Sequence, residues 1–145
     1  MKKKEKMINA YLLRVDPKYS TCYQGYSKGV ENALSFEQKF VGGLIQVISI
    51  NENIDCICND EGKLLELPYN RVWLDDDGTV LDVLCGNLMC VRHDEEGNFT
   101  SILPEDIEVI EKHLIPFCGM VGKRILTTPF MSLPVYDDKE GEDGN

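Results

Sequence analysis

The sequence predicts an α+β domain, in which one antiparallel or mixed sheet of about five to six strands is covered by two helices. Short runs rich in Val, Ile and Leu follow one another without helical segments between them, and only two segments place apolar residues at helical spacing. The length of 145 residues, of which 43% are hydrophobic, suits a single domain. A chain of this size buries about two thirds of its unfolded surface, so no disulfide or metal is needed for folding.

The first strand and the first helix are expected in residues 8–41, after a basic start at residues 1–7 that we expect to be disordered. Residues 8–15 alternate loosely and predict a strand, while residues 18–29 mix tyrosines, polar residues and glycines and predict a long loop. Residues 30–41 have helical periodicity, and Gly42-Gly43 would end that helix. A capping box formed by Ser35 and Gln38 is the alternative, which would shorten the helix to about two turns.

Three strands are expected in the centre of the chain. Residues 44–50 carry apolar side chains on both faces and predict a central, covered strand. Residues 54–58 predict the next strand, and the turn at residues 59–62 leads to a returning strand at residues 63–67. Residues 69–73, with an aromatic residue at each end, predict an irregular segment.

The remaining elements complete the expected domain, which covers residues 8–115. Residues 80–91 predict a strand with a break at Gly86-Asn87, and a short strand follows at residues 99–102. Leu103-Pro104 opens the second helix, whose buried stripe would be Ile107, Ile110 and Leu114. Residues 116–136 predict an extension, strand-like at residues 124–130, that docks on the core or on a neighbouring subunit. Residues 137–145 predict an acidic disordered tail.

Composition excludes several classes of protein. The 25 acidic and 15 basic residues give a net charge of −10, which argues against direct nucleic-acid binding. No apolar run approaches the ~20 residues of a membrane span, so we expect no membrane association. Six cysteines without a secretion signal favour reduced thiols and a cytoplasmic location.

The central stretch resembles a known family. The resemblance is carried by Val41-Gly42-Gly43 and the strand after it, by Cys58-Asn59-Asp60-Glu61-Gly62-Lys63-Leu64, by Leu67-Pro68 with Asn70-Arg71, and by Cys85-Gly86-Asn87. Over roughly residues 8–115 the chain is similar to the domain of unknown function family 3846, small proteins of phages, plasmids and integrative elements, mostly of Gram-positive bacteria. The resemblance implies a mobile-element origin and the host cytoplasm, and it implies no known reaction.

A cluster of polar and aromatic residues forms the candidate ligand site. Its members are Lys63, Tyr69, Asn70, Arg71 and Trp73. The lysine and arginine would supply positive charge, the amide would donate and accept hydrogen bonds, and the aromatic rings would stack on a base. This set suits a small anionic ligand such as a nucleotide. The alternative is that the amide and the arginine fasten an irregular loop through backbone hydrogen bonds while the tryptophan lies in the core.

Metal and enzymatic chemistry find little support in the sequence. Cys56 and Cys58 are one residue apart, which makes a poor zinc chelate even with His93 or His113 nearby. Both histidines are expected at the surface, and no nucleophile–base pair is evident. We therefore expect no cofactor, no metal and no catalytic residue.

Two hypotheses for function follow. The first is a non-enzymatic phage or mobile-element protein that captures a small anionic ligand, such as a nucleotide signal of host defence, and so acts against that defence. The second is an acidic protein–protein inhibitor, or a DNA-mimic-like adaptor, of a host defence or regulatory protein. A homo-oligomer in which a second subunit completes the pocket stays open.

Overall fold

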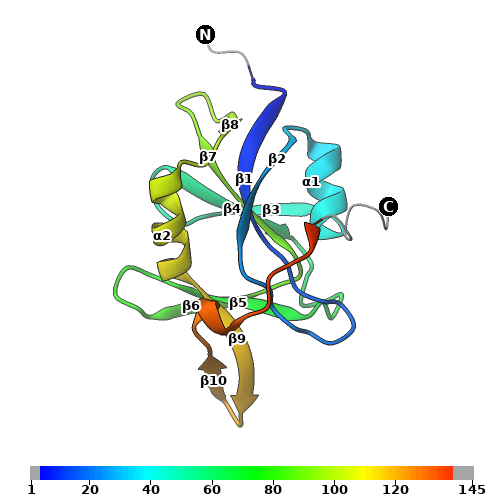
Figure 1. Cartoon of the computed structure of the whole chain (residues 1–145), viewed down its shortest axis with the longest axis vertical. Helices are drawn as coiled ribbons and strands as arrows, with labels where there is room; N and C mark the ends of the chain where they lie inside the picture. Colours follow the sequence, from blue (N-terminus) through cyan, green and yellow to red (C-terminus); the bar gives the residue numbers. More distant parts are fainter. Residues whose placement is uncertain (1–3, 139–145) are drawn as a thin grey trace.

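The computed structural model describes residues 4–138, which form two antiparallel sheets and two α-helices (Figure 1). The larger sheet has six strands in the order β2-β1-β7-β4-β3, with β8 paired to β7. Its strands are β1 (Met7–Leu13), β2 (Tyr26–Glu31), β3 (Ile45–Ser49), β4 (Ile54–Asn59), β7 (Leu88–His93) and β8 (Phe99–Thr100). The predicted α+β class and the two helices are confirmed, and this sheet has the expected size.

A second sheet of four strands, in the order β10-β9-β5-β6, packs beneath the first. Its strands are β5 (Tyr69–Leu74), β6 (Val80–Cys85), β9 (Leu114–Val121) and β10 (Arg124–Thr127), and a short 3-10 helix (Phe130–Ser132) follows them. Three of these strands, β5, β9 and β10, come wholly or mostly from segments predicted to be irregular or an extension. The pairing of β5 with β6 is interrupted by two register shifts, so the polar residues of β5 do not alternate as a regular strand would.

The inner, fully covered strand in this part of the larger sheet is β4, not the preceding apolar run. Every residue of β4 is buried, whereas β3 is an edge strand on which Val47 is 44% exposed. The predicted central position of residues 44–50 is therefore wrong. Burial on both faces depends on which neighbours a strand acquires, and apolar content alone does not specify them.

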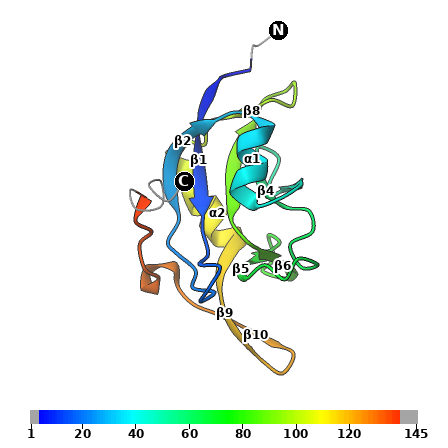
Figure 2. The same cartoon turned by 90° about the vertical axis from the view of Figure 1, so that its right-hand side faces the viewer.

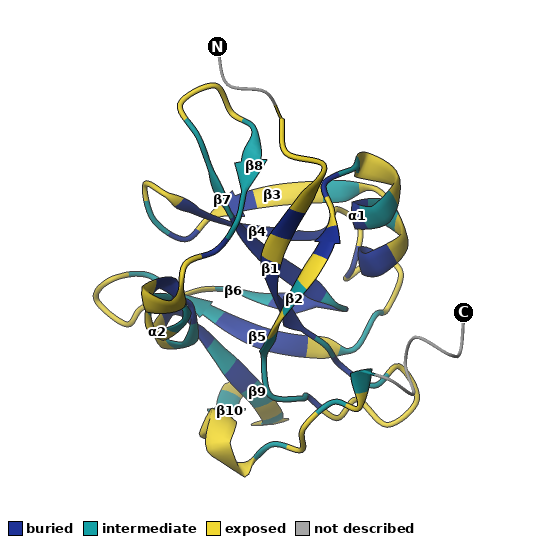
Figure 3. Ribbon diagram, turned by 45° about the horizontal axis from the view of Figure 1, so that its top comes forward, coloured by how far each residue is buried: buried dark blue, intermediate teal, exposed yellow. Residues whose placement is uncertain are grey.

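The two helices cover opposite faces of the larger sheet. On one face Phe40 and Val41 of α1 (Leu34–Val41) pack against the even-numbered residues of β1. On the other face Ile110 of α2 (Pro104–His113) joins a cluster that also includes residues of the second sheet. The odd-numbered residues Tyr11 and Leu13 of β1 join this second cluster, which agrees with the two-residue period of a strand. Figure 3 shows the buried strands between the two exposed helix surfaces.

The helix ends confirm one expectation and correct another. Helix α2 begins at Pro104 as expected, and Asp106 accepts the backbone N–H of Leu103. Helix α1 has 8 residues, the length of the shorter alternative, but its N-cap is Ala33 and not Ser35. Residues 30–31 belong to β2, so the longer helix is wrong.

Residues 63–66 form turns, and residue 67 belongs to no strand, where a returning strand was predicted. The N–H of Leu65 bonds to the carbonyl of Glu61, and that of Leu67 to the carbonyl of Gly62. A Cβ on Gly62 would lie 3.1 Å from Cβ of Cys85, so a glycine permits this close approach to β6. The turns therefore carry the chain directly from the larger sheet to the second one.

The end of the described chain lies along β2 (Figure 2). The backbone N–H of Gln24 bonds to the carbonyl of Pro134 at 2.9 Å, and Nε2 of Gln24 bonds to the carbonyl of Leu133 at 3.0 Å. Within this chain the extension thus docks on its own core. Of the segments predicted to be disordered, residues 1–3 and 139–145 lie outside the described residues. Residue 7, from the predicted disordered start, belongs to β1.

Candidate functional site

Asn70 and Arg71 of the predicted site lie at the junction of the two sheets, with exposed fractions of 0% and 2%. Nδ2 of Asn70 donates hydrogen bonds to the carbonyls of Leu13 and Gly86, both at 2.8 Å. Nη2 of Arg71 donates to the carbonyl of Tyr23 at 2.6 Å. Both side chains use their polar groups inside the fold, as in the alternative interpretation of this cluster, so neither faces a ligand at the surface. Burial also lowers the pKa of the Arg71 guanidinium.

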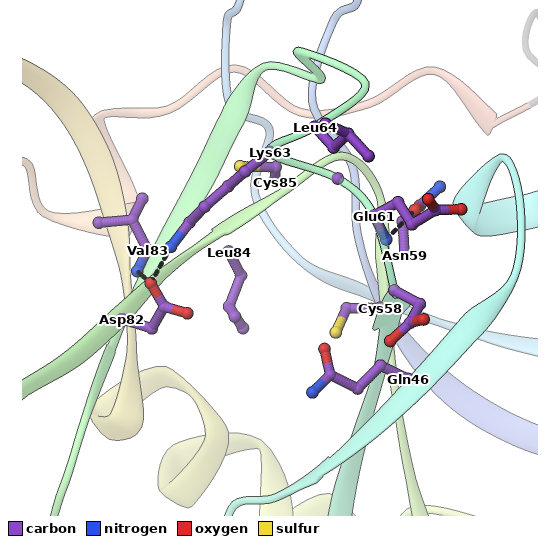
Figure 4. Close-up of a pocket in the computed structure, with 12 residues that line it drawn as sticks. Gln46, Cys58, Asn59, Glu61, Lys63, Leu64, Asp82, Val83, Leu84 and Cys85 are labelled. Carbon is purple, nitrogen blue, oxygen red and sulfur yellow. Dashed lines mark hydrogen bonds and ion pairs between the residues drawn. The ribbon is translucent and has the colours of Figure 1, made fainter.

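The other three members of the predicted site are more exposed. Trp73 is half-buried against the core cluster beside α2. Tyr69 is 38% exposed, and its ring meets Phe117 edge-on at 5.0 Å. Lys63 is exposed and forms an ion pair with Asp82, whose hydrogen bond raises the pKa of the lysine (Figure 4). The structure therefore brings only Lys63 and Tyr69 together, at the rim of an open hollow of about 330 Å³.

A second hollow of about 330 Å³ lies on the other side of Lys63, between β4 and β6 (Figure 4). Three carboxylates line it, from Asp60, Glu61 and Asp82, and Lys63 is the single cation. Since Lys63 already pairs with Asp82, this hollow disfavours an anion. The hollow beside Lys63 is thus unsuited to the anionic ligand that the sequence of residues 63–73 suggested.

A cavity beside α1, larger than the two hollows next to Lys63, was missed by the sequence analysis. It has a volume of about 490 Å³ and is lined by Arg14, Glu31, Ser35, Phe36, Lys39, Phe40 and Asn87. Two cations face one carboxylate there, although the chain as a whole is acidic. The rings of Phe36 and Phe40 stack with centroids 6.3 Å apart, as their four-residue spacing on a helix allows. That spacing was the one signal in the sequence that could have indicated this wall.

Arg14 is the chemically distinctive residue of this cavity. Its guanidinium carbon lies 4.8 Å from the ring centroid of Phe40 and 4.5 Å from that of Tyr136, so two aromatic rings lie near the guanidinium. Its Nε donates a 2.6 Å hydrogen bond to the hydroxyl of Tyr26. Among residues 4–138, no hydrogen bond or ion pair uses its two terminal nitrogens. A half-buried guanidinium held this way can donate two parallel hydrogen bonds to a carboxylate or a phosphate.

The surroundings hold this arginine in place. Oδ1 of Asn87 accepts the N–H of Val15, the neighbour of Arg14, at 3.0 Å. Burial raises the pKa of Tyr26 to about 12, so its hydroxyl stays protonated and neutral at physiological pH. Arg14 therefore has no carboxylate partner on its Nε side. Its positive charge is available to a bound anion.

The histidines and cysteines form no metal site within residues 4–138, where no group of three or more His, Cys, Asp or Glu could hold a metal. His93 lies 2.8 Å from Asp55, and His113 lies 2.8 Å from both Asp76 and the carbonyl of Val109. His113 is 6% exposed, so its predicted surface position is wrong.

No helix in residues 4–138 has the length and apolar character of a membrane span. Comparison with curated proteins and with solved structures found no significant match. A family model matches residues 10–115, which include the later part of β1, the strands β2 to β8, both α-helices and the start of β9. Since this match covers more than half of the 145 residues, the chain belongs to the domain of unknown function family 3846 (DUF3846).

Proposed function

We propose that this protein is a non-enzymatic binding protein that captures a small anionic ligand in the cavity beside α1. The observation that carries the proposal is the state of Arg14. Its side chain is half-buried near two aromatic rings, and its terminal nitrogens have no hydrogen-bond or ion-pair partner among residues 4–138. The proposal moves the site away from the predicted stretch at residues 63–73, where the arginine and the amide are buried.

The other walls of the cavity indicate the class of ligand. Lys39 adds a second, exposed cation, and Ser35 adds a hydroxyl. Phe36 is half-buried and offers an aromatic surface on which a planar ring can stack. A volume of about 490 Å³ falls in the range of small-molecule sites, roughly 300–1,000 Å³. A nucleotide combines the phosphate and the planar ring that this lining suits.

The biological setting is the further part of this proposal. The mobile-element origin that the family resemblance implies would make such a protein a sequestering agent, which removes a nucleotide signal of host defence from the host cytoplasm. Sequestration needs binding alone, which the cations, the hydroxyl and the aromatic surface of this cavity can supply.

Native mass spectrometry and calorimetry with a panel of linear and cyclic nucleotides test the proposal. Arg14→Gln should weaken retention of the bound nucleotide about tenfold or more, because the bidentate anion contact is lost. The matched control is Lys63→Gln, which neutralises an exposed cation outside this cavity and should leave affinity unchanged. Melting curves should show that both variants are folded. Retention of no nucleotide, or loss with Lys63→Gln but not with Arg14→Gln, would reject this site.

A protein–protein role is the second candidate, supported by one feature of the turns before β5. Leu64 and Leu65 are 77% and 52% exposed, next to the exposed acidic residues Glu61 and Glu66. An apolar pair with an acidic rim suits a basic protein partner. Pull-down from host lysate should then depend on Leu64 and weaken with salt. Capture that survives Leu64→Ser and high salt would exclude this surface.

A further inference from the structure

The last described stretch of the chain, residues 133–138, crosses the outer side of β2 and ends next to the proposed site (Figure 2). Tyr136 lies in this stretch, outside the residues 10–115 that the family model matches. Its ring centroid is 4.5 Å from the guanidinium carbon of Arg14. A segment outside the family domain thus contacts the residue on which the binding proposal depends.

We infer that Tyr136 is a positioning residue, which holds the Arg14 guanidinium in the orientation that receives an anion. The effect on affinity rests on the proposed function of the cavity, whereas the effect on the order of Arg14 does not. A guanidinium on a flexible stem loses conformational entropy when it binds, and prior ordering reduces that cost.

The ring of Tyr136 is itself held in place on two sides. It stacks on Tyr26 with centroids 5.6 Å apart and an interplanar angle of 5°, and it meets Tyr23 edge-on at 5.2 Å and 82°. The hydroxyl of Tyr26 meanwhile accepts the Nε–H of Arg14. The guanidinium is therefore fixed through its Nε and by rings near it, which leaves its terminal nitrogens for a ligand.

Asp138, one of the two acidic residues of this segment, is used elsewhere. Asp138 pairs with Lys28 at 2.7 Å and accepts a 3.3 Å hydrogen bond from Tyr26. Within the described chain, Asp138 makes no hydrogen bond or ion pair with Arg14. A segment that competed with an anionic ligand would place a carboxylate against the terminal nitrogens of Arg14. In the observed arrangement the segment contacts the guanidinium through the ring of Tyr136 and leaves the terminal nitrogens available to a ligand.

The test compares Tyr136→Ala with Tyr136→Phe in the full chain. The tyrosine hydroxyl has no hydrogen bond among residues 4–138, so phenylalanine should preserve the contact and alanine should remove it. The first readout is the Nε–H resonance of Arg14 in NMR, assigned with Arg14→Lys. We expect a ring-shifted, slowly exchanging signal in the wild type and in Tyr136→Phe. In Tyr136→Ala the signal should move toward that of a free arginine and broaden or exchange faster.

The second readout is the affinity for two probes, ADP and inorganic pyrophosphate, by calorimetry. Tyr136→Ala should weaken the affinity for both probes about three- to tenfold, and Tyr136→Phe should retain the wild-type affinity. An unchanged Arg14 signal in Tyr136→Ala, or tighter probe binding by that variant, would overturn the inference. If the wild type binds neither probe, the binding proposal fails for those anions, and the NMR arm alone decides whether Tyr136 orders Arg14.

Discussion

Nη1 of Arg71 donates a 2.6 Å hydrogen bond to Oδ1 of its chain neighbour Asn70. The amide of Asn70, on β5 of the second sheet, in turn donates to the carbonyl of Leu13 on β1 of the larger sheet. This neighbouring pair therefore joins the two sheets through buried hydrogen bonds. Asn70 and Arg71 are residue types found in anion sites, but in this fold their side chains hydrogen-bond inside the protein and hold the two sheets together.

Removing the amide of this pair should destabilise the fold. Asn70→Ala removes the buried side-chain donor to the carbonyls of Leu13 and Gly86. It also removes the 2.6 Å acceptor of Nη1 of Arg71, which keeps only a 3.4 Å bond to the backbone carbonyl of residue 70. We expect the free energy of unfolding to fall by about 3 kcal/mol or more in urea titrations. Lys63→Ala breaks an exposed ion pair and should cost about 1 kcal/mol or less. Equal effects of the two substitutions would show that the buried pair does not fasten the sheets.

The carboxylate at the start of α2 should make stability depend on acid. Asp106 accepts bonds of 2.6 and 2.8 Å from Arg92, and chiefly this partner holds the pKa of Asp106 below its ordinary value of 3.8. A lowered pKa stabilises the fold above the unfolded value, and the contribution is lost as pH falls through the folded value. Asp106→Asn should therefore lower the free energy of unfolding by about 2 kcal/mol at neutral pH, with a difference that shrinks below about pH 4.

The control for this pH effect is Asp77→Asn, because Asp77 is an exposed acid in a turn. It should change neither the stability at neutral pH nor the acid dependence. Urea titrations at several pH values measure both quantities. A wild-type protein whose advantage over Asp106→Asn persists undiminished in strong acid would contradict the assignment.

Two glycines with similar positive φ allow the cost of backbone strain to be compared with the cost of steric crowding when each is replaced by alanine. Gly86 and Gly78 have φ of 78° and 83°, a region that favours glycine. A Cβ on Gly86 would lie 2.9 Å from Cδ1 of Leu67, whereas a Cβ on Gly78 would meet nothing within 4 Å. We expect alanine to cost about 1 kcal/mol at Gly78 and about 2–3 kcal/mol at Gly86. Thermal melting of the two variants gives the comparison, and equal losses would show that Leu67 moves aside freely.

Thiol reactivity should distinguish one cysteine from the other five. Cys118 is exposed, whereas Cys22, Cys56, Cys58, Cys85 and Cys90 are buried. Burial raises the pKa of Cys58 to about 11, which keeps that thiol protonated and unreactive in native protein. One equivalent should react rapidly with a disulfide reagent at mildly alkaline pH, and Cys118→Ser should abolish that phase. Rapid reaction of further thiols in folded protein would show that the core opens more readily than its packing indicates.

The sequence by itself determined the α+β class, the first strand and the start of the second helix. These features depend on local periodicity, on Pro104 at a helix start, and on glycines such as Gly42 that accept a positive φ at a helix end. The family membership likewise follows from the order of residues along the chain. Each of these signals is contained in a short stretch and needs no knowledge of distant neighbours.

Only the tertiary structure decided which polar residues face a ligand and which face the interior. Asn70 and Arg71 are buried because β5 pairs with both β6 and β9, and β9 comes from a segment predicted to be an extension. Arg14 gains its aromatic surroundings because the fold brings Phe40 and Tyr136 beside it from distant parts of the chain. Long-range pairing sets the burial and the partners of a side chain, and those two properties determine whether its charge fastens the fold or is free to bind.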